Sequence, residues 1–176
     1  EGYLFSSDDG FAAAIKAREM ARRHGTTVAL TLSDPFMVGA FKERFDAIID
    51  QGIDLLFCNE EEAMACTGAA DRAAAGDLLA GRTATTFITC GADGALVYAD
   101  GGKELIPGVE VTAVDTTGAG DLFAGGALYG LSHGYSPADS ARLGSYAAAQ
   151  VVARFGPRLE DSLADRIDGI LAHFAT

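Results

Sequence analysis

Seven consecutive residues in the second half of the chain combine glycines with carboxylates in a pattern that suits phosphoryl transfer. The segment Asp115–Asp121 reads DTTGAGD, and its two glycines, Gly118 and Gly120, let backbone N–H groups approach an anion closely. A helical pattern follows, so the positive end of a helix would attract phosphate there. A carboxylate at this point repels phosphate, but Asp121 could accept a proton from an attacking hydroxyl group. The alternative is a glycine-rich turn in which Asp121 only stabilises the first turn of the helix.

A second acidic segment, Asn59–Glu62, follows a predicted strand and permits two interpretations. Asn59 as N-cap and Glu62 three residues later form the pattern of a capping box, which needs no ligand. The same carboxylates follow the carboxyl end of a strand, where open α/β sheets bind ligands, and clustered oxygens attract Mg²⁺. The spacing alone favours the structural role, and the two roles can hold together.

The segment 89–94 reads TCGADG and lies between two predicted strands. Its glycines suit a hairpin, because glycine adopts a positive φ without steric cost. Ser145 lies in an alanine-rich helical pattern, where close packing explains a small residue equally well. The residues alone therefore indicate a turn and a closely packed helix.

Around these motifs, strand-like runs alternate with helical ones, which predicts an α/β fold with a largely parallel sheet. The strands are expected at residues 3–5, 27–32, 55–58, 85–90, 95–99 and 103–106. The helices are expected at residues 9–25, through 41–49, at 59–67, 70–81, 121–131 and 136–155, and near the C-terminus. The turn signal Asp100–Gly102 predicts a hairpin that breaks the simple alternation.

Two of the helical patterns also predict which face is buried. In the helix after Asp121, apolar residues recur at the spacing of one helical face, namely Ala124, Ala127, Leu128 and Leu131. The last helix is expected to pack against the sheet through Leu163, Ile167, Ile170, Leu171 and Phe174.

Composition limits the class of protein. The 176 residues suffice for one domain, and a formal net charge of −12, from 13 basic and 25 acidic residues, argues against a nucleic-acid partner. Three cysteines without CxxC spacing indicate neither a disulfide framework nor a zinc site, and they fit a reducing cytoplasm. No apolar run is long enough for a membrane span. The sequence also lacks the P-loop pattern and a GxGxxG run after a strand, so neither of those phosphate-binding schemes is supported.

The segment Asp115–Asp121 resembles the DTxGAGD signature of the ribokinase-like (PfkB) family of carbohydrate and nucleoside kinases. The resemblance implies a three-layer α/β/α fold with a largely parallel central sheet and a β-hairpin. It extends over nearly all 176 residues but only over the C-terminal half of the family's fold. Residues 1–176 are therefore expected to form the nucleotide-binding and catalytic portion of such a kinase. An N-terminal half with the acceptor site and a lid would be the partner, and a homodimer through that lid is a further expectation.

The family's motifs imply roles for individual residues. Asp121 would act as the catalytic base, while backbone amides stabilise charge on the transferring phosphoryl group. Those amides belong to Gly118, Ala119 and Gly120. The residues expected to face ATP, the last of them near adenine, are Thr89, Gly91, Gly94 and Ser145.

Cation sites follow from the same resemblance. Asn59 and Glu62 match the family's NxxE motif, which implies that they organise the phosphates and position Mg²⁺ through water. Asp115 and Thr117 match a site for a monovalent cation such as K⁺. Its remaining ligands would be backbone atoms of Val151, Arg154 and Gly156.

These assignments predict an ATP- and Mg²⁺-dependent kinase that phosphorylates a primary hydroxyl group of a small nucleoside or sugar. The segments Thr31–Phe36 (TLSDPF) and Leu56–Ala63 (LFCNEEEA) resemble adenosine kinases more than sugar kinases. Asp34 departs from that pattern, because Asp34-Pro35 is a dipeptide common in sugar kinases. An adenosine kinase-like acceptor is thus favoured over a ribokinase- or fructokinase-like one. The alternative from another class is an inactive nucleotide-binding module, or one piece of a split enzyme.

Overall fold

The computed structural model describes residues 1–175 and divides into two compact units. Unit 1 holds residues 1–88 and 98–102, and unit 2 holds residues 89–97 and the chain from residue 103 onward. Five strands form one sheet in the order β1-β2-β3-β4-β5. None of the helices within residues 1–175 combines the length and the apolar character that crossing a membrane requires.

Unit 1 alternates strands with helices. Its helical elements are η1 (Gly2–Ser6), α1 (Asp8–Arg23), α2 (Pro35–Ala40), α3 (Lys42–Asp50), α4 (Glu60–Thr67) and α5 (Arg72–Ala80). Its strands are β1 (Ala29–Thr31), β2 (Ile53–Asn59) and most of β3 (Thr83–Thr89). Strands β1 and β2 pair in parallel, with Leu30 opposite Leu56. Helices cross over between these strands, as parallel neighbours require.

The core of unit 1 consists of aromatic and branched side chains from every layer of the alternation. Phe57 and Phe87, from β2 and β3, stack with their ring centroids 4.9 Å apart. The fully buried side chains of this core include Phe5, Leu32, Phe45, Ile49, Leu56, Leu79 and Phe87. Burial of such side chains stabilises the fold by about 1.5–3 kcal/mol each.

The predicted strand at residues 3–5 is wrong, because this segment is the 3₁₀ helix η1. The N–H of Gly2 donates to Oγ of Ser33 at 2.8 Å, and the N–H of Leu4 donates to the carbonyl of Glu1. Phe5 is then buried edge-on against Phe45, with centroids 4.7 Å apart. A three-residue apolar run does not distinguish a strand from a helical turn, and tertiary packing decides here.

The helix predicted through residues 41–49 starts at residue 42, because the backbone leaves helical geometry at residue 41. Helix α2 ends at Ala40 and α3 begins at Lys42, because Phe41 leaves helical geometry with φ −125° and ψ 30°. Gly39 in the last turn of α2 lowers helix propensity just before this break. Phe45, Ile48 and Ile49 of α3 are buried.

Unit 2 begins with the end of the sheet and continues into helices. Its elements are η2 (Gly91–Asp93), most of β4 (Ala95–Ala99) and of β5 (Gly102–Ile106), α6 (Ala119–Ser132), α7 (Pro137–Val152), η3 (Ala164–Arg166) and α8 (Ile167–His173). The predicted hairpin between β4 and β5 is confirmed. Asp100 and Gly101 both have positive φ, 52° and 75°, as a type I′ turn requires.

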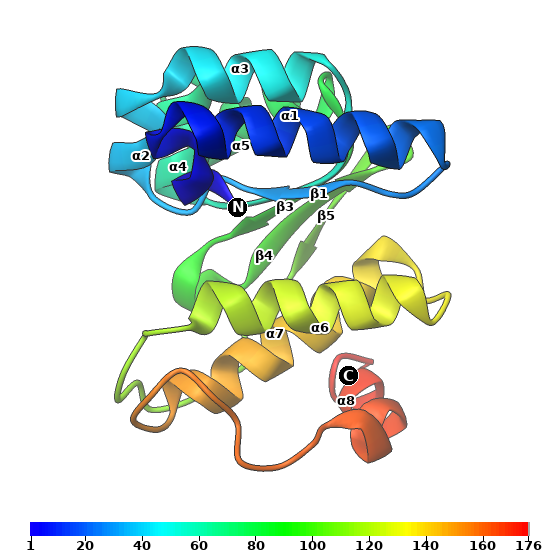
Figure 1. Ribbon diagram of the computed structural model, residues 1–176. Coiled ribbons are helices and arrows are strands. Elements are labelled where there is room, and N and C mark those ends of the chain that lie inside the picture. Colours follow the sequence, from blue (N-terminus) through cyan, green and yellow to red (C-terminus); the bar gives the residue numbers. More distant parts are fainter. Residues whose placement is uncertain (176) are drawn as a thin grey trace. The chain divides into compact units, whose positions relative to one another are not determined.

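Helices α6 and α7 lie side by side in unit 2 (Figure 1), and small residues set their separation. A Cβ on Gly126 would lie 2.8 Å from Cα of Gly144, and one on Gly130 would lie 2.6 Å from Oγ of Ser140. The predicted buried face of α6 is therefore partly wrong. Ala127 is buried, but Leu128 is 39% exposed, since the glycines turn the contact face toward α7.

The last helix also departs from expectation. Helix α8 packs mainly against α7. The Tyr146 hydroxyl accepts a hydrogen bond from Nη2 of Arg166 at 2.9 Å, and His173 meets the Tyr146 ring edge-on. Of the predicted face, Ile170 is buried. The periodicity located the apolar face but did not identify what it contacts.

Candidate functional site

The turn before α6 closely approaches a distant segment of unit 2. Gly118, the N-cap of α6, has φ 80° and ψ 2°, a left-handed conformation that glycine adopts readily. A Cβ on Gly118 would lie 2.7 Å from Cβ of Pro157 and 2.9 Å from its Cα. Gly118 therefore serves a close backbone contact with the chain after α7, besides opening the helix.

Asp115 anchors the start of this turn. Its Oδ1 accepts from the N–H of Thr117 at 2.9 Å, and its Oδ2 accepts from the N–H of Gly156 at 3.1 Å. The N–H groups of Val114 and Asp115 donate to the carbonyl of Val152, at 2.8 and 3.2 Å. Hydrogen bonds from the side chain and the N–H of Thr117, and from the N–H of Gly156, hold the pKa of Asp115 below its usual value.

Asp115 and Thr117 thus lie together with Gly156, as the expected cation site requires. The contacts that join them, however, are hydrogen bonds. Gly156 contributes an N–H donor to Asp115, and the carbonyl of Val151 already accepts from the N–H of Arg154 at 3.2 Å. These bonds stabilise the turn without an ion. The monovalent-cation role stays a prediction.

The amides at the start of α6 differ from one another. The N–H of Ala119 donates to the carbonyl of Thr116 at 3.2 Å, so this amide is engaged within the turn. The first N–H groups of a helix have no intrahelical acceptor, which leaves the amide of Gly120 suited to an anion. Of the three predicted amides, Ala119 is therefore the least available.

Asp121 lies in the first turn of the 14-residue helix α6 and is exposed. No side chain caps this helix end, and within residues 1–175 no hydrogen bond or ion pair engages the Asp121 carboxylate. A first-turn acid without a capping partner is available to accept a proton. The alternative role, a favourable charge at the helix end, needs the same position.

A cavity of about 480 Å³ lies within unit 2, beside this turn. The predicted residues that line it are Thr89, Gly91, Gly94, Ala119, Gly120 and Ser145. Sequence reasoning missed its other walls, which comprise Ala92, Gly108, Val109, Glu110, Val111, Ala113, Thr116, Phe123, Ala148, Ala149 and Val152. Most of these are small or apolar residues without a motif, and only proximity to the DTTGAGD segment could have identified them.

Two backbone segments beside the cavity pass very close to each other. A Cβ on Gly94 would lie 2.0 Å from the carbonyl oxygen of Ile106, and one on Gly108 would lie 2.1 Å from the carbonyl oxygen of Ala92. The segment 91–94 can therefore lie directly on residues 106–108. Gly94 has this structural role in addition to lining the cavity, whereas space beside Gly91 is open.

Ser145 supplies an unusual polar group to the cavity. The residue is 8% exposed, and within the described residues its Oγ has no hydrogen-bond partner. A buried hydroxyl without a partner costs about 1–3 kcal/mol, so a ligand group that bonds to it would recover that cost. This feature fits a ligand with polar edges, such as a nucleobase, in an otherwise apolar cavity.

The predicted capping box lies in unit 1 and is confirmed. Oδ1 of Asn59 accepts from the N–H of Glu62 at 2.7 Å, and Oε2 of Glu62 accepts from the N–H of Asn59 at 3.0 Å. Nδ2 of Asn59 also donates to Oε1 of Glu62 at 2.9 Å. Both carboxylate oxygens of Glu62 are therefore held by one residue.

The carboxylate of Glu62 is buried near other acidic side chains. It is 6% exposed, and burial raises its pKa, with hydrogen bonding from Asn59 opposing and the charges of Asp34 and Glu61 adding to the rise. A buried carboxylate beside other acids is a fitting ligand for a hard cation. Among residues 1–175, however, no group of three acids, histidines or cysteines could hold a metal by itself. Glu62 could therefore hold a magnesium ion only together with water or other ligands, and this role stays a prediction.

Fold and site together define an α/β protein with a glycine-rich turn at the start of a helix and a cavity beside it. The chain belongs to the pfkB family of carbohydrate kinases, whose family model matches residues 1–163. The predicted family and fold class are confirmed.

Individual relatives differ in what they phosphorylate. The structure of adenosine kinase from Sinorhizobium meliloti has a TM-score of 0.90 at 34% identity, and that of a probable sugar kinase from Rhizobium etli has 0.91 at 32%. Each match covers 96% of this chain and 52% of the other. Cytidine kinase from Thermococcus kodakarensis is 40% identical over 108 residues, 59% of this chain and 38% of that protein. The chain thus spans about half the length of these structures.

Proposed function

We propose that this chain forms the nucleotide-binding and catalytic portion of an ATP-dependent kinase that phosphorylates a primary hydroxyl group. The observation that carries the proposal is the turn before α6. One turn supplies the unengaged carboxylate of Asp121 and, through Ala119 and Gly120, a wall of the 480 Å³ cavity. A base and a binding cavity on the same helix end are what transfer from a bound nucleotide requires.

In this proposal each residue has a defined task. Asp121 accepts the proton of the acceptor hydroxyl group while the hydroxyl oxygen attacks the terminal phosphoryl group of the nucleotide. The bond from that phosphoryl group to the leaving diphosphate then breaks. The amides of Gly118 and Gly120 and the positive end of α6 face the charge that develops on the phosphoryl oxygens. Glu62 would hold Mg²⁺ through water, and the ion would neutralise charge on the phosphates.

For the acceptor, we propose a nucleoside of the adenosine type. Support comes from the segments 31–36 and 56–63 and from two relatives named for nucleosides. A sugar is the second candidate, because Asp34 and Pro35 form the dipeptide of sugar kinases. Here Asp34 caps α2, its Oδ1 accepting from the N–H of Phe36 at 2.7 Å, and it raises the pKa of Glu62.

We also propose that residues 1–176 work with an N-terminal half of the same protein, in the cytoplasm. Support comes from the 52% coverage of the solved relatives and from three buried cysteines that are not in disulfides. Strand β1 lies at one end of the strand order, so its outer edge can accept another strand. A homodimer through the lid of that half, and a bound K⁺, remain part of the proposal.

The test is a screen of acceptors on the full-length protein. Melting temperature is measured with ATP and Mg²⁺ and a panel of nucleosides and sugars, and ADP release is then measured for each acceptor that stabilises the protein. We expect adenosine to give the largest stabilisation and turnover. Turnover with sugars alone would favour the second candidate, and nucleotide binding without turnover of any acceptor would support an inactive module.

A further inference from the structure

The cavity beside α6 has an uneven distribution of polar groups. Its lining includes one ionisable residue among the 17 that form it, Glu110, in the loop between β5 and α6. Ser145 and two threonines, Thr89 and Thr116, are the other residues with polar side chains. The remaining walls offer apolar contact or backbone only. A ligand in this cavity therefore meets one charged acceptor.

We propose that the carboxylate of Glu110 accepts a hydrogen bond from the 6-amino group of adenine and so selects the base of the phosphoryl donor. This inference rests on the proposed nucleotide-binding function of the same cavity. It goes beyond that function because the amides and the helix start at the DTTGAGD turn suit phosphate and do not distinguish one base from another.

Among the side chains that line the cavity, Glu110 is the one that distinguishes between bases. A hydroxyl both donates and accepts, so Ser145 can bond to either edge of a base without choosing between bases. An ionised carboxylate accepts only, and it therefore rewards a base that presents an N–H donor. The apolar residues around it, among them Val111 and Ala148, contact the faces of any purine equally well.

The expected size of the effect follows from the exposure of Glu110. A hydrogen bond to a charged group discriminates by about ten- to a hundredfold in affinity. Glu110 is exposed, so water competes for its oxygens and we expect the lower end of that range. The affinity for a purine without the amino group should thus be about tenfold weaker.

The experiment compares ATP with purine riboside triphosphate, which lacks only the 6-amino group. Dissociation constants are measured by calorimetry on the full-length protein for the wild type, Glu110→Ala and Glu110→Gln. We expect ATP to bind about tenfold more tightly to the wild type, about equally with its analogue to Glu110→Ala, and by an intermediate ratio to Glu110→Gln, which keeps a neutral acceptor.

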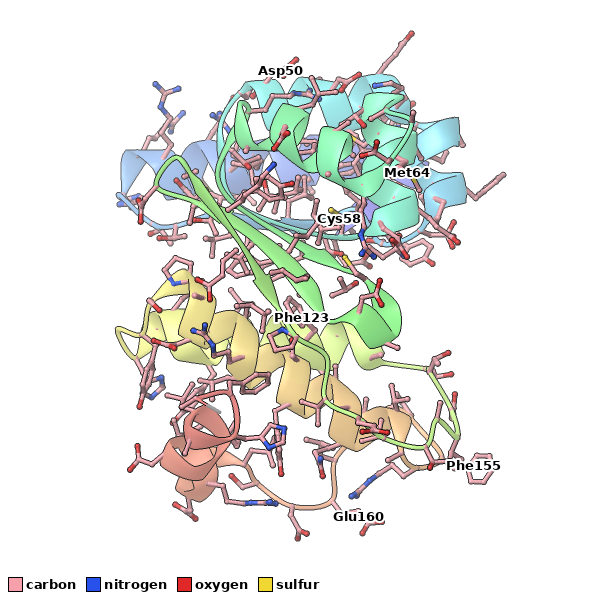
Figure 2. All side chains as sticks on the ribbon, turned by 180° about the vertical axis from the view of Figure 1, so that it is seen from behind. Asp50, Cys58, Met64, Phe123, Phe155 and Glu160 are labelled. Carbon is pink, nitrogen blue, oxygen red and sulfur yellow. The ribbon has the colours of Figure 1, made fainter. Side chains whose placement is uncertain are left out.

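The matched control is Glu160→Ala, because Glu160, labelled in Figure 2, is an exposed acid of the same unit that does not line the cavity and forms an ion pair with Arg154 at 4.0 Å. It should retain the wild-type ratio. Equal binding of the two nucleotides to the wild type, or an unchanged ratio in Glu110→Ala, would overturn the inference and leave the proposed function intact. If neither nucleotide binds, both the inference and the proposed function are overturned. Equal binding to the wild type overturns the inference even where a variant fails to fold, and Glu110→Gln carries the assignment to Glu110 where Glu110→Ala fails to fold.

Discussion

At the scale of single residues, the candidate acids differ in whether they already have a structural partner. Asp115 and Glu62 each have both carboxylate oxygens engaged by N–H donors. Asp121 has neither a cap nor an ion pair within the described residues. An acid that chemistry must protonate and deprotonate is best left without such bonds, since each would hold one protonation state.

The base assignment predicts a large separation between activity and stability in Asp121→Asn. The change is nearly isosteric, and losing a negative charge at a helix start should cost about 0.3–1 kcal/mol of stability. General-base assistance is worth about 10²–10⁴ in rate, roughly 3–5 kcal/mol. We expect kcat to fall by at least a hundredfold while ATP affinity holds, measured with melting temperature on the same samples. More than about a tenth of the wild-type kcat would contradict the assignment.

The two roles of Glu62 separate in Glu62→Gln. Glutamine at this position keeps the reciprocal hydrogen bond of the capping box, and it removes a buried charge beside Asp34 and Glu61. Its amide has one oxygen, so the second acceptor that Nδ2 of Asn59 uses is lost. Stability should therefore change little, while the Mg²⁺ concentration for half-maximal rate should rise several-fold. Asn59→Ala is the comparison, because loss of the N-cap should cost about 0.5–2 kcal/mol. An unchanged Mg²⁺ dependence in Glu62→Gln would leave capping as its whole role.

At the scale of elements, close packing of α6 on α7 fixes the helix that carries the turn. Predicted segments and structure agree where capping and turn chemistry are local, as in α4, α5 and the β4–β5 hairpin. They disagree where a partner element decides, as in η1, α8 and the buried face of α6. The sequence of α6 alone does not explain its glycines, because the residues that leave no room for a side chain lie on α7.

Two neighbouring glycines of α6 should respond in opposite ways to alanine. In Gly126→Ala the new Cβ would lie 2.8–2.9 Å from backbone atoms of α7, and such overpacking costs about 1–3 kcal/mol. Gly125→Ala meets no atom within 4 Å and should stabilise by about 0.5–1 kcal/mol, because alanine is the better helix former. Thermal unfolding of the two variants measures both effects. A stabilised Gly126→Ala would show that the helices separate easily.

At the scale of the whole molecule, the family and the motif segments could be predicted from the sequence, whereas much of the cavity could not. The DTTGAGD and NEEE segments carry their chemistry in adjacent residues. The cavity lining comes from β3, the 91–94 turn, the loop between β5 and α6, the first turns of α6, and α7. Residues such as Val109 and Ala148 share no spacing, so only the fold brings them together.

The edge position of β1 makes a prediction about assembly. An N-terminal half expressed separately should bind residues 1–176, because an unpaired strand edge accepts another strand. Co-purification and size-exclusion chromatography measure the complex, and Thr31→Pro would be the variant that weakens it, since proline removes a backbone donor. A chain 1–176 that is monomeric and turns over acceptor alone would contradict the prediction.

One of the two hydrogen bonds of Asp115 comes from Gly156, 41 positions away in the sequence, and so joins the chain before α6 to the chain after α7. Opening either end must release the carboxylate, so the amide protons of Thr117 and Gly156 should exchange with solvent water at similar rates, as one cooperative unit. The lowered pKa of Asp115 sets the pH window. This protection is fully present above the ordinary pKa of the carboxyl group and is lost as pH falls through the lowered one. Ligand binding at the turn should then change the hydrogen-exchange rate of the Gly156 amide, which lies beyond the end of α7.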